Sequence, residues 1–371
     1  MDCNLLPLPE GKILYYRVWD IGDDINLETV QAVFEQEANA QRFRLKRESR
    51  AMIINNAPLF VGLGLWQHRI GNYNLEIEAQ SKIWYFGAVS ITLQITIPAG
   101  LNFNQLIELT SHIELDPMLL SIAKQKCKEV AQKIDPKRLN SIEWETYETY
   151  EIYFFKSLPE IEDTLDVLKK YNVPGLILSE GKENLSEQIK IAVTDSAYQY
   201  NKNDLAIIDW NSALVIDPHF LMDVPDVIEF ALCQLLEMRY YDDLLDQKLN
   251  TLYNALEKKN SSIFSNHYQK ISQEAAQKYI EISETVENVE NSMKVVGDFF
   301  FAKIFRAASS KFRFKDWQES VDKKLSNLAE VSKLYAGEIH EKRSQMLEII
   351  VIILISVEVL PFLAGIIKKI F

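Results

Sequence analysis

Cysteine, glycine-rich loops and paired histidines are scarce in this sequence of 371 residues. Its three cysteines, Cys3, Cys127 and Cys233, are far apart and odd in number, so neither a disulfide framework nor a paired-cysteine metal site is indicated. The 12 glycines form no GxGxxG or GxxxxGK motif, and nucleotide binding through such loops is therefore unsupported.

Catalytic signatures are missing as well. The five histidines stand alone, outside any HExxH or CxxC pattern, and no GxSxG nucleophile elbow occurs. The sequence therefore identifies no catalytic residue, metal ligand or cofactor, although a triad assembled from distant residues stays open.

Basic residues are fewer than acidic residues overall, but several of them form one local cluster. A net charge of −13 argues against a general nucleic-acid or anionic-lipid surface and against DNA as a partner. In the segment RFRLKRESR, alternation places Arg42, Arg44 and Lys46 on one strand face. These three residues are a candidate anion-binding site for RNA or lipid headgroups, and an ordinary exposed strand face is the favoured alternative.

An acidic run is interleaved with aromatic residues at Glu143, Glu145, Glu148 and Glu151. Its two interpretations are a paired-carboxylate or metal site and a solvated strand face. The second is favoured, because spacing alone does not fix the geometry that carboxylate chemistry needs.

Residues 1–222 are predicted to form an α+β domain with an antiparallel or mixed sheet. Strand-like segments alternate with amphipathic ones, and Asp116-Pro117 is a helix start with cap and first-turn proline. Residues 223–346 contain almost no proline and are predicted to form a helical coiled-coil stalk. Its helices are expected over about 226–258, over 275–300 with a strict heptad seam, and from 314 onward.

The tail, residues 347–371, is predicted to be a transmembrane anchor. Ile349 to Ile367 is almost wholly apolar, and nineteen helical residues reach roughly 28 Å, close to the ~30 Å hydrocarbon core. Glu358 within it costs about 2.5–3.5 kcal/mol unless it is satisfied. Glu358 and Ser356 are therefore candidate oligomerisation residues, with an ion or proton path as the alternative.

The C-terminal half also resembles a known family. Asp298-Phe299-Phe300, Lys324-Leu325, Glu341-Lys342-Arg343 and Val357-Glu358-Val359 are similar to segments of the required-for-meiotic-nuclear-division family. The resemblance covers about residues 205–360. It implies a membrane-anchored oligomer without established catalysis, and by analogy a ribosome or another membrane-proximal complex as partner.

The sequence alone thus favours a self-associating, membrane-anchored scaffold or tether. Without a signal or transit peptide, the N-terminal domain is expected in the cytoplasm and the span in a bacterial inner membrane. An enzyme with a site in the α+β cleft is the alternative, and an ion or proton transport subunit using Glu358 is a weaker one.

Overall fold

The chain was described with a computed structural model, which covers residues 2–22, 25–35, 41–42, 57–140, 142–180, 185–257, 277, 279–280, 283 and 299–370. It divides into two compact units, one of residues 1–239 and 289–316 and the other of residues 240–288 and 317–371. The three-part division expected from the sequence stays a prediction.

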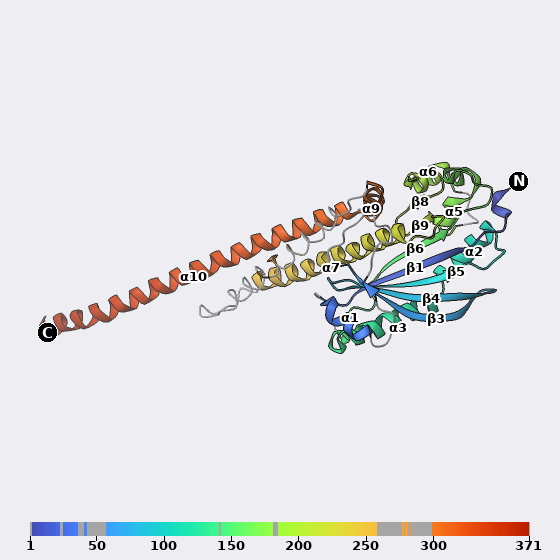
Figure 1. Ribbon diagram of the computed structural model, residues 1–371. Helices are drawn as coiled ribbons and strands as arrows, with labels where there is room; N and C mark the ends of the chain where they lie inside the picture. The colour runs from blue at the N-terminus through green and yellow to red at the C-terminus, as the bar shows by residue number, and fades with distance from the viewer. Residues whose placement is uncertain are drawn as a thin grey trace. The chain divides into compact units, whose positions relative to one another are not determined.

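The first unit is built on one nine-stranded sheet (Figure 1), in the order β2-β3-β4-β5-β1-β6-β9-β8-β7. All neighbouring strands are antiparallel except β6 and β9, which are parallel. The strands are β1 Gly11–Asp20, β2 Gln41–Arg42, β3 Leu59–Ile70, β4 Tyr73–Ile83, β5 Ala88–Thr96, β6 Glu148–Phe155, β7 Ala197–Tyr198, β8 Leu205–Ile208 and β9 Ser212–Ile216.

One face of the sheet carries the main core beneath six helices. These are α1 Leu27–Glu35, α2 Phe103–Glu114, α3 Pro117–Ile134, α4 Val167–Lys170, α5 Val173–Ile177 and α6 Glu187–Thr194. Helix α3 begins as the sequence predicts, with the Asp116 carboxylate accepting hydrogen bonds from two backbone amides and Pro117 in the first turn.

The opposite face is covered by the first half of helix α7, Asp223–Glu257, and by helix α9, Phe299–Lys311 (Figure 1). Aromatic rings pack both helices against the sheet. The ring centroid of Trp84 lies 5.2 Å from that of Phe230 in α7, and the Phe230 centroid lies 5.9 Å from that of Phe305 in α9. Alternation along β4 explains why the sheet has two different faces, since Leu75 and Ile77 are buried while Glu76 and Glu78 are exposed.

In the second unit, the second half of α7 packs with helix α10, Phe314–Ile370. Leu245, Val321 and Leu328 are fully buried there. The Lys324 ammonium lies 2.8 Å from Asp242 and 2.6 Å from Asp246. The heptad helix predicted over 275–300 lies almost entirely outside the described residues.

The predicted transmembrane anchor is wrong. Helix α10 runs on to Ile370, but none of the helices has, over the residues that the structure describes, the length and apolar content that crossing a bilayer requires. The single-pass inner-membrane localisation is overturned with it.

Candidate functional site

The most unusual chemistry of the first unit lies buried between the sheet and α7. The Lys82 ammonium donates a 2.6 Å hydrogen bond to Asp226 and a second, short one to Glu229. The three side chains are at most 8% exposed. We call Lys82, Asp226 and Glu229 the buried triad.

Local structure brings the buried triad together. Lys82 ends the polar side of β4, directly beside Ser90 of β5, and its side chain points toward α7. Asp226 and Glu229 are three residues apart in the first two turns of α7, a spacing that places both carboxylates on one helix face. The lysine thus bridges two elements that are more than 140 residues apart in the chain.

The charges of the triad do not balance, because one ammonium faces two carboxylates. Burial raises the pKa of Asp226 to about 7, with the charge of Glu229 adding to the shift and Lys82 opposing it. Burial alone would lower the pKa of Lys82, but the two carboxylates outweigh it and raise that pKa. We infer that the lysine stays charged and that Asp226 is partly protonated near neutral pH.

Further polar atoms face the same interface. Burial raises the pKa of the Tyr16 hydroxyl well above its ordinary value, and the charges of Glu229 and Asp226 add to that shift. Neither this hydroxyl nor Glu229 Oε1 has a hydrogen-bond partner among the described residues. The site can therefore hold or release a proton within the interface between sheet and helix.

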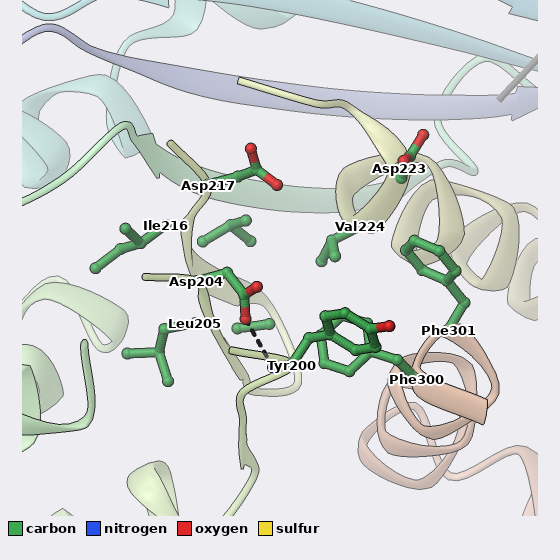
Figure 2. Close-up of a pocket in the computed structure, with 11 residues that line it drawn as sticks. Tyr200, Asp204, Leu205, Ile216, Asp217, Asp223, Val224, Phe300 and Phe301 are labelled. Atoms are coloured by element: carbon green, nitrogen blue, oxygen red, sulfur yellow. Dashed lines mark hydrogen bonds between the residues drawn. The ribbon is translucent and has the colours of Figure 1, made fainter. Parts of the chain in front are cut away.

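A small cavity lies beside the start of α7 and is drawn in Figure 2. Its walls come from the facing ends of β8 and β9, the first residues of α7 and the first turn of α9. It is lined by Tyr200, Asp204, Leu205, Ala206, Val215, Ile216, Asp217, Asp223, Val224, Phe300 and Phe301. The rings of Tyr200 and Phe300 meet edge to face at 5.4 Å on one side of it.

Two carboxylates of this cavity, Asp204 and Asp217, accept hydrogen bonds from nearby backbone amides. Asp204 accepts hydrogen bonds from the backbone amides of Tyr200 at 2.7 Å and Asn201 at 3.1 Å, and Asp217 accepts one from the His219 amide at 2.8 Å. The cavity volume is about 20 Å³, enough for a single water. Because none of the described residues that line it carries a basic side chain, the cavity suits water or a small cation and disfavours an anion.

The acidic run is not the solvated strand face that the sequence favoured, because its two strand residues are buried on opposite faces of β6. Glu148 lies 2.6 Å from Arg239 of α7, whereas Glu151 lies 3.9 Å from Arg17 on the other face. Burial raises the pKa of both carboxyls to about 7 against these arginines. The metal alternative also fails for the described residues, where no group of metal-ligating side chains occurs.

The candidate residues predicted from the sequence lie partly outside the described residues. The Ser356 hydroxyl donates to the Ile352 carbonyl of its own helix at 2.7 Å, and the side chain of Glu358 lies outside the described residues. Arg42 pairs with Leu59 through its backbone, while Arg44 and Lys46 are not described. Their oligomerisation and anion-binding roles stay predictions.

The sequence of this chain matches one protein family over its N-terminal part. A family model described as "Uncharacterized protein MJ0711, N-terminal domain" matches residues 10–223, more than half of the chain. The chain belongs to this family. The MJ0711 N-terminal domain family thus spans all nine strands and helices α1 to α6, and it includes Lys82 but ends before Asp226 and Glu229.

An archaeal protein is also similar in sequence to this chain. Uncharacterized protein MJ0711 of Methanocaldococcus jannaschii is 23% identical over 226 residues, which cover 59% of this chain and 67% of the relative. No solved structure matches the chain. The resemblance to the required-for-meiotic-nuclear-division family is therefore wrong, because the family that matches is the MJ0711 N-terminal domain family and neither comparison indicates the other one.

Sequence reasoning missed the buried triad. The available signals were a lysine directly before the apolar Ile83-Trp84 and an acid pair, Asp226 and Glu229, within an apolar stretch of helix. Neither signal identifies the partner, since the contact joins distant segments.

Proposed function

We propose that this protein is a self-associating scaffold that presents the sheet domain on helices joining several copies. The observation that carries the proposal is the exposed part of α10 between Leu347 and Val359. Ten large apolar side chains in it are between 44% and 66% exposed. Successive helical residues point about 100° apart, so these side chains surround the helix.

Apolar side chains exposed to this extent favour contact with another apolar surface. A fully buried aliphatic side chain gains about 1.5–3 kcal/mol, so ten half-exposed ones gain on the order of 10 kcal/mol when covered. Association costs roughly 4–15 kcal/mol, which makes the segment large enough to support a stable complex of at least two copies. Ser356 does not oppose burial, because its hydroxyl is already bonded within the helix.

A second copy is the occupant that the chain itself supplies. Every copy carries the same apolar segment, and identical surfaces readily form closed symmetric assemblies. The second unit already uses this kind of packing, with Val321 and Leu328 buried between helices. Lipid anchoring and transport through Glu358 are not part of the proposal, and the ribosome analogy lapses with the family resemblance.

The enzyme alternative gains no specific support. The carboxyl with the most strongly raised pKa near neutrality, Asp226, does not line the cavity of Figure 2. The scaffold therefore accounts for more of what the structure describes.

The test is the molar mass of the full chain in solution, measured by light scattering on a sizing column. We expect an oligomer for the unaltered chain and a monomer for the double variant Ile352→Asp, Ile355→Asp, because two buried charges oppose association. Ser326→Asp, at an exposed position of the same helix, is the matched control and should leave the mass unchanged.

Two results would overturn the proposal. One is a monomer at every concentration of the unaltered chain. The other is a chain that binds lipid vesicles through Leu347–Val359 but remains monomeric without them, since the segment's cover would then be lipid.

A further inference from the structure

A second and larger cavity lies at the edge of the sheet where its two parallel strands end. Lys156 and Ser157 directly follow β6, and Pro218 comes two residues after β9. Residues 202 and 203 precede β8, which runs antiparallel to β9 and so begins at the same edge. In open parallel α/β sheets, ligands bind beyond the carboxyl ends of the strands, and the cavity lies at the corresponding end of the parallel pair β6 and β9.

We call this second cavity the edge cavity. Its size and lining suit a small organic molecule. Its volume is about 310 Å³, at the lower end of the range for small-molecule sites. Leu158, Ile161 and Pro218 give it an apolar side, and Ser157, Thr164 and Asn203 give it a polar one.

Hydrogen bonds hold the wall of the cavity in place. Thr164 donates from its hydroxyl to the Asp204 carbonyl at 2.6 Å and from its amide to the Lys202 carbonyl at 3.0 Å. The Gln199 amide donates to the Thr164 hydroxyl at 2.9 Å and to Asp163 at 2.8 Å. The turn that carries Lys202 is therefore fixed against the loop after β6 rather than free to swing.

Two ammonium groups and one carboxylate line the edge cavity. Lys202 forms no ion pair with any described residue, and Lys156 pairs with Glu10 at 2.6 Å on the surface, where both side chains are about half exposed. Such an exposed ion pair contributes little to the free energy of folding, so an anion can replace Glu10 beside Lys156 at little cost. Among the described residues that line the cavity Glu162 is the one acid, while Glu10 pairs with Lys156 and the charge of Asp163 interacts with Lys202 from beside the cavity.

We propose that the edge cavity binds a small organic anion, with a phosphate or carboxylate head between Lys156 and Lys202 and a compact apolar part against Leu158 and Ile161. The anion is held by charge-assisted hydrogen bonds from the two ammonium groups. This site is independent of self-association through α10, and it is distinct from the basic cluster singled out in the sequence.

Titration calorimetry of the full chain with phenyl phosphate and with inorganic phosphate tests the proposal. We expect saturable binding of phenyl phosphate, tighter than that of inorganic phosphate because only the former covers the apolar side. Lys202→Gln should weaken phenyl phosphate binding by about tenfold or more, as loss of one charge-assisted hydrogen bond implies. Lys156→Gln should weaken it as well.

The matched control is Lys169→Gln, since Lys169 is 80% exposed, lies near the same loop and does not line the cavity. It should bind phenyl phosphate as the unaltered chain does. An equal loss in this control would show attraction to general surface charge and would overturn the proposal, as would the absence of saturable binding to both probes.

Discussion

Replacing Lys82 by methionine tests the account of the buried triad most directly. Methionine keeps the length of the side chain but removes the ammonium, which leaves Asp226 and Glu229 facing each other in a dry interface. Removing one partner of a buried ion pair costs about 3–5 kcal/mol, because a charge remains uncompensated. We expect a loss of this size in the free energy of unfolding at pH 8.

The loss should depend on pH with a definite sign. Without the ammonium, the pKa of Asp226 rises further in the folded state because the opposing positive charge is gone, so this carboxyl is protonated and neutral at low pH. The destabilisation should therefore shrink as the pH falls from 8 to 5. Urea unfolding followed by tryptophan fluorescence measures both values, because Trp84 packs against Phe230 at the same interface.

Two further variants sharpen the result. Adding Asp226→Asn and Glu229→Gln to Lys82→Met should restore much of the stability, since the triple variant leaves no charge within the triad. Lys169→Met, at an exposed position, should change little. A loss below about 1 kcal/mol, or an equal loss at both pH values, would refute the reasoning about the triad.

Three other outcomes follow from the buried interfaces. The pKa of Glu148 and of Glu151 is raised from 4.5 to about 7, so their contribution to stability is fully present below about pH 4.5 and is lost as the pH rises through about 7; unfolding at a series of pH values measures it. Gly87→Ala should lower the melting temperature markedly, because φ is +105° and the added Cβ would lie 1.8 Å from the Gly22 carbonyl oxygen. Phe230→Ala should lower the free energy of unfolding by about 3–5 kcal/mol in chemical denaturation, since the ring is buried between Trp84 and Phe305.

The parts of the fold that follow from local signals are visible in the sequence. Helix α3 has its cap at Asp116 and its proline at the first position, and both act as local chemistry dictates. Gly87 interrupts a long strand-like segment, and a glycine in such a segment indicates a corner or bulge. Gly87 forms the turn that divides one long apolar segment into β4 and β5.

Helix α6 shows that a short alternating pattern is compatible with more than one secondary structure. In α6 the alternation of Ile189, Ile191 and Val193 indicates a strand, but the Ser186 hydroxyl accepts a hydrogen bond from the Ile189 amide and starts a helix. Only Val193 is buried in this helix, while Ile189 and Ile191 are exposed. Capping and tertiary contact override a short alternating pattern.

The buried triad and the edge cavity lay beyond sequence reasoning for a different reason. The polar side of β4 is exposed at Glu76 and Glu78, and the same alternation places Lys82 in water. Only the first turns of α7, which cover that end of the strand, bury it. Lys156 and Lys202 likewise line one cavity because of the pairing of β6, β9 and β8, which no local pattern reveals.

The position of β1 in the sheet has a consequence for synthesis and for truncation. The first strand of the chain lies in the middle of the sheet, with β5 on one side and β6 on the other. The strands β2 to β5 and β6, β9, β8, β7 are joined in the sheet only through it. A newly made β1 must therefore wait for more than a hundred further residues before both of its edges are paired, and a chain shortened past Asp20 would separate the sheet into two halves with new open edges.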